Sequence, residues 1–345
     1  MTETPEPIAV IGAGSWGSAL ANVLARGGHR VRLWARTPAR AATITSSHAN
    51  PPYHDGPLSP DIAVTADLAT ALAGAEIVIL AIPSQAMRVT VEAAAAHLGS
   101  EAIVVSAAKG FELETGATMT EVISATLSSR LPVIAMSGPN IAAEIAGGLP
   151  AATVVACADP GAAARVRDVC NGPQLRFYSG DDVIGVEYGG ALKNVIAIAA
   201  GICDGIGIGD NGKAAIITRG LAEMTRLGVG AGANPLTFAG LTGVGDCVVT
   251  CMSSHSRNRG LGDAIGRGAN ADAYAASTPM VIEGVNATRA AVSLAERYGV
   301  DVPIARQVHA VLFEEKKVED ALMDLMGRGP GDELRGLGLT ATEGG

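Results

Sequence analysis

The stretch Ile8-Ala-Val-Ile-Gly12-Ala-Gly14-Ser-Trp-Gly17 carries three glycines at G-x-G-x-x-G spacing, between a β-branched apolar run and an alanine- and leucine-rich run. Gly12 allows a tight turn, Gly14 lets a pyrophosphate approach the backbone, and Gly17 lets a helix pack closely on a strand. The helix that follows turns its N-terminal N–H groups toward the anion. In this context the spacing predicts a dinucleotide-binding turn; the alternative is a turn that only packs.

Short apolar runs alternate with alanine-rich helical stretches from residue 8 to about residue 180. Most of the runs are continuously apolar, which is typical of strands buried on both faces of a parallel sheet. We expect strands at Ile8–Ile11, Arg30–Ala35, Glu76–Ile82, Ala102–Ser106, Val133–Met136, Ala152–Ala156 and Leu175–Tyr178. The pattern predicts an α/β, doubly wound (Rossmann-type) N-terminal sheet, whose ligands bind at the carboxyl ends of the strands.

The strand signal fades after Gly180, where Asp181 and Asp182 can cap a long helix that runs through Cys203. A mostly α-helical C-terminal domain is expected beyond, broken by glycine- and asparagine-rich turns near 205–212, 228–235 and 240–246. The predicted organisation is a flexible N-terminus at 1–7, a dinucleotide-binding domain at 8–180, a helical substrate and catalytic domain at 181–326, and a flexible tail at 327–345.

Composition narrows the class of protein. A chain of 345 residues with 48% hydrophobic residues is long enough for two globular cores. Its net charge of −9, with no basic run, argues against nucleic acid as a partner. The acidic, proline-bearing start is unlike a signal peptide, and the apolar runs are too short to span a bilayer. We therefore expect a cytoplasmic protein without membrane insertion.

Five cysteines form no C-x-x-C pair and are expected to be reduced thiols. Cys247 and Cys251 can share a helical face, but no nearby histidine or cysteine completes a zinc set. We predict no metal site.

The second expected strand is followed by Arg36, where a site that prefers NAD usually presents Asp or Glu to the ribose hydroxyl. An arginine favours a 2′-phosphate, so we expect NADPH to be preferred and NADH to be tolerated; a solvated Arg36 is the alternative. Trp16 can either wall the cofactor crevice or pack the first helix.

The helical stretch Gly185–Gly201 is apolar around much of its circumference and contains Lys193. Burial of an ammonium group is costly and favours the neutral amine, which can exchange protons. Gly189 and Gly190 weaken this helix, which is expected where another backbone or a ligand comes close. We predict a catalytic Lys193; the alternative is a side chain that reaches the surface.

Lys109 follows the strand at Ala102–Ser106 and is therefore expected at the carboxyl edge of the sheet, where it could polarise a carbonyl oxygen. As a loop residue it could equally be solvated. Ser137-Gly138-Pro139-Asn140 leaves another strand in the same way and could lend N–H donors to a substrate.

A phosphate-binding pattern lies in Gly240-Leu-Thr-Gly-Val-Gly-Asp246 and in the later His255-Ser256-Arg257-Asn258. Glycines expose backbone N–H groups, Arg257 offers a planar fork that matches phosphate oxygens, and Ser256 and Asn258 add neutral donors. The alternative is a glycine-rich loop with solvated polar residues.

Taken in order, these motifs resemble the NAD(P)-dependent glycerol-3-phosphate dehydrogenases of the bacterial soluble type, over nearly the whole chain except its tails. The sequence departs from the family pattern at Asn140 and Ile141, where Ser or Thr and then Phe are usual, and in the segment 51–56.

The resemblance implies roles for individual residues. Lys193 would be the proton acceptor for the C2 hydroxyl of glycerol 3-phosphate, with Lys109 and Asp246 in the same polar network. Substrate-binding positions would be Lys109, Gly138, Asn140, Lys193, Asp246, Ser256, Arg257 and Asn258. Cofactor-binding positions would be Gly12, Gly14, Ser15, Trp16, Gly17, Arg36, Lys109, Ala142, Arg257, Val281 and Glu283.

The resemblance also implies reversible hydride transfer between glycerol 3-phosphate and dihydroxyacetone phosphate, a role in glycerolipid backbone synthesis, and a homodimer. Two other functions stay open on the residues alone. One is a β-hydroxyacid or 6-phosphogluconate-type dehydrogenase, against which the Ser256-Arg257-Asn258 segment argues. The other is a non-catalytic dinucleotide sensor, which needs no buried Lys193.

Overall fold

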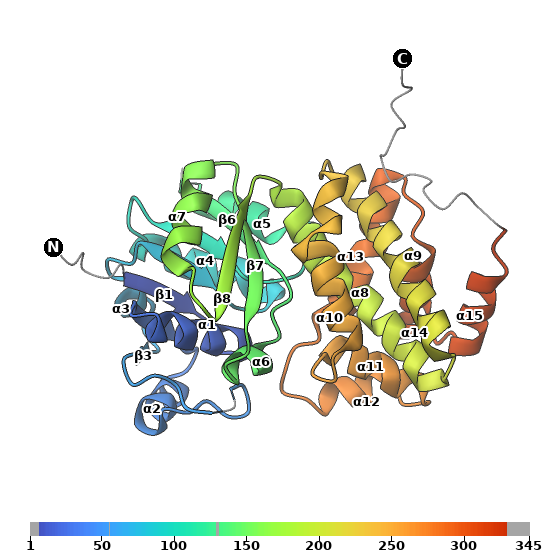
Figure 1. Ribbon diagram of the computed structural model, residues 1–345, viewed down its shortest axis with the longest axis horizontal. Coiled ribbons are helices and arrows are strands. Elements are labelled where there is room, and N and C mark those ends of the chain that lie inside the picture. The colour runs from blue at the N-terminus through green and yellow to red at the C-terminus, as the bar shows by residue number, and fades with distance from the viewer. Residues whose placement is uncertain (1–6, 55, 129–130, 330–345) are drawn as a thin grey trace, which may run out of the picture. The chain divides into compact units, whose positions relative to one another are not determined.

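A computed structural model describes residues 7–54, 56–128 and 131–329 (Figure 1). The predicted flexible N-terminus and tail lie outside the described residues, apart from Pro7 and residues 327–329. The chain divides into two compact units, one formed by Met1–Lys109 with Ala117–Val183 and the other by Gly110–Gly116 with Ile184–Gly345. Each unit has its own hydrophobic core.

The first unit contains a single mixed sheet. Its strands are β1 (Pro7–Ile11), β2 (Arg30–Trp34), β3 (Ala63–Thr65), β4 (Ile77–Leu80), β5 (Ile103–Ser106), β6 (Val133–Ser137), β7 (Ala151–Ala156) and β8 (Leu175–Gly180). Within the described residues they form an 8-stranded sheet in the order β3-β2-β1-β4-β5-β6-β7-β8. Neighbouring strands are parallel except β6 and β7. The predicted doubly wound α/β sheet is confirmed.

Two details of the sheet differ from the sequence prediction. The edge strand β3 was not expected, because its three residues are too few to show a periodic pattern. β7 runs antiparallel to β6, although a parallel sheet was expected. The connection between β6 and β7 contains only the five-residue helix α6 (Ala142–Ala146), and a short connection suits antiparallel neighbours better than a parallel crossover.

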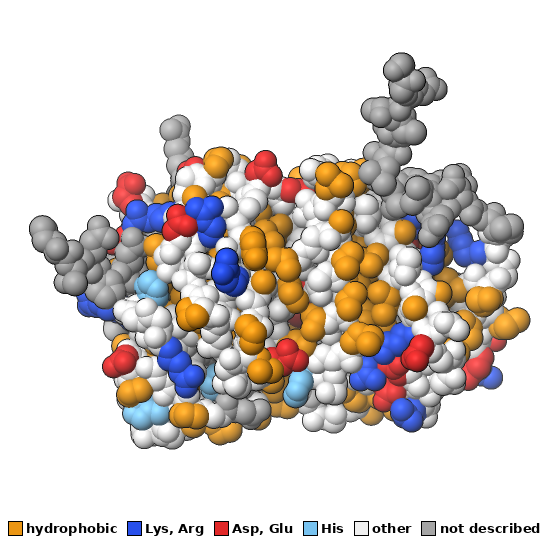
Figure 2. Space-filling model, viewed as in Figure 1, with side chains coloured by type: hydrophobic (Ala, Val, Ile, Leu, Met, Phe, Trp, Pro, Cys, Tyr) orange, Lys and Arg blue, Asp and Glu red, His pale blue; other side chains and the backbone are white. Residues whose placement is uncertain are grey.

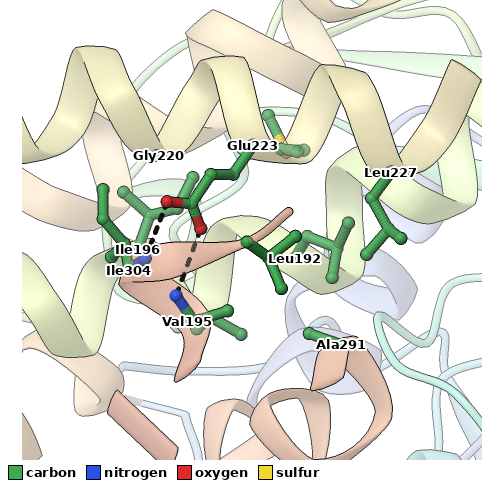
Figure 3. Close-up of a pocket in the computed structure, with 11 residues that line it drawn as sticks. Leu192, Val195, Ile196, Gly220, Glu223, Leu227, Ala291 and Ile304 are labelled. Atoms are coloured by element: carbon green, nitrogen blue, oxygen red, sulfur yellow. Dashed lines mark hydrogen bonds between the residues drawn. The ribbon is translucent and has the colours of Figure 1, made fainter. Parts of the chain in front are cut away.

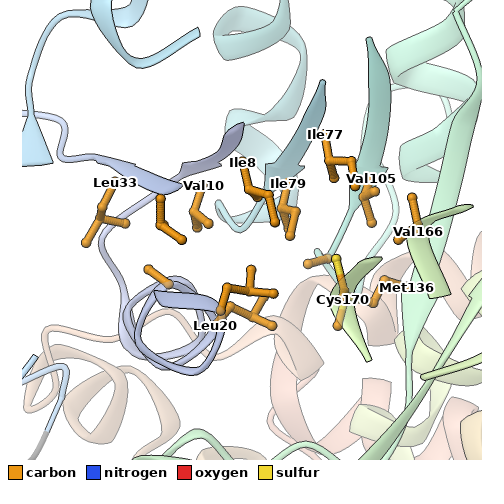
Figure 4. Close-up of a cluster of buried hydrophobic side chains, with 14 of the residues drawn as sticks. Ile8, Val10, Leu20, Leu33, Ile77, Ile79, Val105, Met136, Val166 and Cys170 are labelled. Atoms are coloured by element: carbon orange, nitrogen blue, oxygen red, sulfur yellow. The ribbon is translucent and has the colours of Figure 1, made fainter. Parts of the chain in front are cut away.

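Helices cover both faces of this sheet. Besides α6 they are α1 (Ser15–Arg26), α2 (Pro38–Ser47), α3 (Leu68–Leu72), α4 (Met87–Ala94), α5 (Met119–Leu127) and α7 (Pro160–Cys170). Successive strand residues point to opposite faces. Ile8 and Val10 pack with Leu20 of α1 in one core cluster (Figure 4), whereas Ala9 and Ile11 pack in the cluster that contains side chains of α3, α4 and α5. Burial on both faces explains the continuously apolar runs.

The second unit is helical in its described part. Its helices are α8 (Val183–Ile206), α9 (Gly209–Gly230), α10 (Asp246–Met252), α11 (Arg257–Gly266), α12 (Ala271–Ala276), α13 (Glu283–Tyr298), α14 (Pro303–Phe313) and α15 (Val318–Met326). The long helix expected after Asp182 is α8. By length and composition α8 could cross a membrane, which the short apolar runs did not suggest. However, 89% of its most apolar window is buried inside the protein, as in the core helix of a globular unit.

Close backbone contacts fix the position of α8. A Cβ atom at Gly189 would lie 2.8 Å from the carbonyl oxygen of Thr242, as expected for a helix glycine that another backbone approaches. On the other side, a Cβ atom at Gly262 of α11 would lie 2.0 Å from the carbonyl oxygen of Ile198. Only glycine permits this approach. The middle of α11 is thereby held close to the backbone of α8 at Ile198.

The surface carries charges of both signs. Figure 2 shows Lys and Arg side chains next to Asp and Glu side chains on one face of the described residues. Among the described residues, several charged side chains pair: Arg165 lies 2.6 Å from Glu76 and Arg267 lies 2.9 Å from Asp263. Exposed pairs of this kind each contribute little to stability.

A buried carboxylate joins α9 to α14 (Figure 3). Glu223 is only 5% exposed, lies among apolar side chains such as Leu192 and Ile196, and accepts hydrogen bonds from the N–H groups of Ile304 at 2.7 Å and Ala305 at 3.1 Å. It therefore caps α14, whose own N-cap residue Val302 supplies no side-chain cap. Burial raises the pKa of Glu223 to about 7, although the two N–H donors oppose the shift.

This carboxylate should make stability depend on pH. Because the pKa of Glu223 rises from 4.5 to about 7 on folding, its contribution to stability is fully present below pH 4.5 and is lost as the pH rises through about 7. At roughly 1.4 kcal/mol per pKa unit, the difference in unfolding free energy between the unmodified protein and Glu223→Gln should change by about 3 kcal/mol over this range. Urea unfolding followed by circular dichroism at several pH values measures this difference.

Glu319→Gln, which removes an exposed carboxylate from α15, is the control for that experiment. It should shift the unfolding curve equally at every pH. A parallel pH dependence for Glu223→Gln and the unmodified protein would contradict the assignment.

Candidate active site

The glycine-rich turn joins β1 to α1. Gly12 has φ +118°, and a Cβ atom there would lie 2.4 Å from the carbonyl oxygen of Ala81. A Cβ atom at Gly17 would lie 1.8 Å from the carbonyl oxygen of Gly12, whereas one at Gly14 would meet no described atom within 4 Å. Packing therefore requires glycine at the first and third positions of the motif. The middle position leaves space beside the backbone.

This turn fits the pyrophosphate of a dinucleotide. α1 begins at Ser15 with Gly14 as its N-cap, and among the described residues no side chain caps it and no acidic residue lies in its first turn. No carboxylate of the first turn of α1 therefore opposes the positive end of the helix dipole, and a ligand phosphate can interact with it. The open space beside Gly14 gives such a group access to the backbone.

The two other cofactor candidates near the turn differ in exposure. Trp16 is partly buried and packs against the core of the first unit, as expected for a side chain that packs the first helix. Arg36 is exposed and lies two residues beyond the end of β2. Its position at a strand end agrees with the expected place for a residue that contacts the ribose.

Candidate substrate residues of the first unit gather where β5 and β6 end. The Nζ atom of Lys109 donates a hydrogen bond to the carbonyl oxygen of Gly138 at 2.8 Å, so this lysine is held and is not a freely solvated loop residue. Asn140 donates through Nδ2 to the carbonyl oxygen of Ala152 at 2.9 Å. Its Oδ1 atom is buried and has no hydrogen-bond partner among the described residues. Ala142 is the first residue of α6.

Lys193 lies inside the second unit. It is 7% exposed, and its Nζ atom donates hydrogen bonds to Oδ1 of Asp246 at 3.0 Å and to Oγ1 of Thr250 at 2.7 Å. Asp246 is 1% exposed and also accepts a hydrogen bond from Thr250 at 3.2 Å. Thus Lys193 does not reach the surface, and its charge is paired. A buried amine bonded to a carboxylate and a hydroxyl group can exchange a proton without losing its orientation.

A second polar network begins at the next residue of α8. Asn258 of α11 donates through Nδ2 to Oδ1 of Asn194 at 2.8 Å, and its own Oδ1 accepts from the backbone N–H of Gly284 at 3.0 Å. Both asparagines are buried. Since Asn194 follows Lys193 on α8, this network fixes the start of α11 beside Lys193.

The remaining candidates of the second unit surround the start of α11. Ser256 is the N-cap of α11 and accepts the N–H of Arg259 at 3.2 Å. Arg257 is exposed and donates through Nη1 to the carbonyl oxygen of Val281 at 2.6 Å, so the structure brings these two candidates together. Glu283 begins α13, directly before Gly284. A helix N-terminus with an exposed arginine is suited to bind an anion.

The segment Gly240–Asp246 does not form the open phosphate-binding loop expected from its glycines. Leu241–Gly245 is a π-helical turn that continues into α10, and the N–H of Gly245 donates to the carbonyl oxygen of Gly240 at 3.1 Å. A Cβ atom at Gly243 would lie 2.0 Å from the carbonyl oxygen of Phe238. Gly243 therefore serves close packing within this segment, and Asp246 follows as the first residue of α10.

The five cysteines are buried and form no disulfide. Sγ of Cys247 lies 3.9 Å from Sγ of Cys251, one turn further along α10. Among the described residues, no group of three or more His, Cys, Asp or Glu side chains could hold a metal ion.

Two polar residues of the site were not selected from the sequence. Thr250 lies four residues after Asp246 and therefore on the same face of α10, a spacing that could have identified it. Asn194 stands next to Lys193 but is recognised only through its partner Asn258, which is 64 residues away in the chain.

A Rossmann-type sheet with a dinucleotide turn, together with a buried lysine–carboxylate pair in a helical unit, defines an NAD(P)-dependent oxidoreductase. Comparison with known proteins identifies the family. Residues 7–163 match the model of the NAD-dependent glycerol-3-phosphate dehydrogenase N-terminus, and residues 182–323 match the model of the C-terminus. The chain belongs to the NAD-dependent glycerol-3-phosphate dehydrogenase family.

Individual relatives agree with this assignment. The chain is 47% identical over 330 residues to a glycerol-3-phosphate dehydrogenase [NAD(P)+] of Prosthecochloris aestuarii, with 95% of this chain and 99% of that protein covered. It is 46% identical over 335 residues to the protein of the same name from Streptomyces griseus, with 96% and 99% covered. The crystal structure of glycerol-3-phosphate dehydrogenase from Coxiella burnetii matches with a TM-score of 0.90 at 34% identity and covers 94% of this chain and 99% of that one.

Proposed function

We propose that this protein is an NAD(P)-dependent glycerol-3-phosphate dehydrogenase that interconverts sn-glycerol 3-phosphate and dihydroxyacetone phosphate. The observation that carries the proposal is the buried Lys193–Asp246–Thr250 network beside the Asn194–Asn258 pair. The network can move a proton, and the pair fixes the start of α11, where an anion can bind. Oxidation of a three-carbon alcohol with a terminal phosphate needs a group that accepts the hydroxyl proton and a site that binds the phosphate.

Lys193 is the proposed proton acceptor. In oxidation, the C2–H bond breaks with its electron pair, the O–H proton passes to the Lys193 amine, and a C2 carbonyl group forms. The bound nicotinamide supplies or accepts the hydride. In reduction, the Lys193 ammonium donates its proton to the C2 oxygen. Asp246 stabilises the ammonium and Thr250 keeps it oriented, which is the arrangement general acid–base catalysis requires.

The phosphate of the substrate is proposed to bind at the N-terminus of α11. Arg257 supplies a charged fork, Asn258 is held in place by Asn194 and Gly284, and Ser256 caps the helix. Hydrogen bonds to a charged group contribute about 1.5–3 kcal/mol each. Binding a group remote from C2 positions the reacting carbon.

The first unit is proposed to bind the dinucleotide, within a domain at 8–180, and the substrate and catalytic domain at 181–326 supplies the proton-transfer group. Gly12, Gly14, Ser15, Trp16 and Gly17 form the pyrophosphate turn. Lys109 is proposed to polarise the carbonyl oxygen of the substrate near Gly138 and Asn140. Proposed cofactor contacts further along the chain are Ala142, Arg257, Val281 and Glu283.

NADPH is the proposed preferred cofactor because Arg36 can pair with a 2′-phosphate. Arg36→Asp should lower the ratio of kcat/KM for NADPH to kcat/KM for NADH by about tenfold to a hundredfold, the effect of losing a charge-assisted hydrogen bond. Steady-state assays with each cofactor measure the ratio. Arg26→Asp, the same charge change at an exposed position near the end of α1, is the control and should leave the ratio unchanged. An unaltered ratio in Arg36→Asp would remove Arg36 from cofactor selection.

A spectrophotometric assay tests the proposed reaction. The purified protein should oxidise NADPH when dihydroxyacetone phosphate is added, and sn-glycerol 3-phosphate should be the product. Turnover of a β-hydroxyacid or of 6-phosphogluconate, without turnover of dihydroxyacetone phosphate, would support the related dehydrogenases instead. Binding of NADPH without turnover of any of these compounds would support a dinucleotide sensor.

We also propose that the enzyme is a cytoplasmic homodimer and that its product supplies the backbone of glycerolipids. The support is the family resemblance. Sedimentation of the purified protein tests the dimer, and a monomeric mass at working concentration would contradict it.

A further inference from the structure

The loop that joins α2 to β3 is anchored to the glycine-rich turn by one buried side chain. Asn50 in this loop is fully buried, and its Nδ2 atom donates to the carbonyl oxygen of Ala13 at 3.0 Å and to Oγ of Ser18 at 2.7 Å. These partners precede Asn50 by 37 and 32 residues in the chain. Ala13 lies between Gly12 and Gly14, and Ser18 lies in the first part of α1.

The orientation of the Asn50 amide follows from its partners. The Ala13 carbonyl oxygen can only accept a hydrogen bond, so it must face the NH₂ group. The Oδ1 atom of Asn50 is then left buried with no partner among the described residues. An unpartnered buried acceptor is costly. The unpartnered oxygen is accounted for if the two hydrogen bonds that the Asn50 NH₂ group donates are required to hold the glycine-rich turn.

The bond to Ala13 has a geometric consequence for Gly14. A peptide group is planar and trans, so the carbonyl group of Ala13 and the N–H of Gly14 point in opposite directions. Holding the oxygen toward Asn50 therefore holds the Gly14 N–H away from it. The bond to Ser18 also fixes the helix, whose N–H at Ser18 donates to the carbonyl oxygen of Gly14 at 2.9 Å. Asn50 thus holds both ends of the Gly14 backbone in position.

We infer that Asn50 is a positioning residue for cofactor binding, which presets the Gly14 N–H and the start of α1 for the pyrophosphate. The inference rests on the proposed function, because it requires the turn to bind a dinucleotide. Asn50 acts through the turn and need not touch the cofactor. Loss of the Asn50 side chain should therefore weaken the binding of ligands that contain a pyrophosphate and leave the binding of ligands without one unchanged.

A matched buried asparagine provides the control. Asn22 lies on the same helix α1, is 3% exposed, accepts the N–H of Ser59 at 2.8 Å and donates to the carbonyl oxygen of Pro57 at 3.5 Å. It anchors a later part of the same connection without a hydrogen bond to the glycine-rich turn. Asn22→Ala should lower stability without altering the turn.

The experiment compares Asn50→Ala and Asn22→Ala in the full chain. NADPH affinity is measured by fluorescence titration, adenosine 2′-phosphate affinity by calorimetry, and stability by urea unfolding. Asn50→Ala should weaken NADPH binding about tenfold, which is the effect of one or two lost hydrogen bonds. It should change adenosine 2′-phosphate affinity by less than about twofold and leave kcat at saturating NADPH nearly unchanged. Asn22→Ala should leave both affinities unchanged at a similar loss of stability.

A second variant keeps the test valid if Asn50→Ala does not fold. Asn50→Asp retains the size of the side chain and can accept a hydrogen bond from Ser18, but it places a second acceptor against the carbonyl oxygen of Ala13. This variant should therefore also weaken the binding of NADPH more than the binding of adenosine 2′-phosphate. Unchanged NADPH affinity in the Asn50 variants, or equal losses in Asn50→Ala and Asn22→Ala, would overturn the inference while the proposed function stands. Failure of the unmodified protein to bind NADPH or NADH would overturn both.

Discussion

Lys193→Ala should lower kcat about a thousandfold while the dissociation constant of NADPH changes by less than about twofold. Removing a positioned proton donor and acceptor typically costs about 10²–10⁴ in rate. The side chain lies in the second unit, bonded to Asp246 and Thr250, and the glycine-rich turn belongs to the first. The rate of NADPH oxidation at saturating dihydroxyacetone phosphate gives kcat, and fluorescence titration gives the dissociation constant.

Two further variants separate proton transfer from general disruption. Lys213→Ala removes another partly buried lysine of the same unit, which pairs with Asp204 at 2.8 Å, and should leave kcat nearly unchanged. Thr250→Val keeps the Lys193–Asp246 pair but removes one hydrogen bond that orients the amine, so kcat should fall about tenfold. A Lys193→Ala enzyme that keeps kcat within about threefold would exclude Lys193 from the reaction.

Arg257→Ala should raise KM for sn-glycerol 3-phosphate and for dihydroxyacetone phosphate by about tenfold to a hundredfold. The loss of a charge-assisted hydrogen bond to phosphate accounts for this size. Dihydroxyacetone lacks the phosphate, so its slow reduction should be affected much less and the variant should discriminate poorly between the two substrates. Steady-state kinetics with both substrates measures the discrimination.

Arg267→Ala is the matched control for Arg257. Arg267 lies at the other end of α11, is 65% exposed and pairs with Asp263. Its loss should leave both KM values unchanged. Equal discrimination between dihydroxyacetone phosphate and dihydroxyacetone in Arg257→Ala and the unmodified protein would contradict a phosphate site at the start of α11.

Much of the first unit could be predicted because local sequence determines it. Apolar runs such as Ile77–Leu80 are buried on both faces, and the glycine spacing at 12–17 reflects close contacts within one turn. The strand β3 is too short to give a pattern, and the apolar pattern of β7 does not show in which direction the strand runs beside β6. The glycine-rich segment 240–246 predicted exposed N–H groups, but its residues 241–245 form a π-helical turn in which Gly243 packs against the backbone of Phe238.

The candidate site was predictable where one residue conflicts with its surroundings. Lys193 stands out because an ammonium group in an apolar helix needs a partner. The pair Asn194–Asn258 does not stand out, because a polar residue in a helix looks ordinary until folding brings a second polar residue against it. The same is true of Asn50, whose contact with Ala13 joins distant parts of the chain.

The proposed reaction requires the Lys193 amine to exchange a proton with the C2 oxygen of a substrate whose phosphate is bound at the start of α11. A crystal structure of the protein with sn-glycerol 3-phosphate and NADP⁺ would show both contacts at once. We expect the C2 oxygen at about 3 Å from Nζ of Lys193, with the phosphate on Arg257 and the first turn of α11. A C2 oxygen beyond hydrogen-bond reach of Lys193, with the phosphate bound elsewhere, would contradict the proposed reaction.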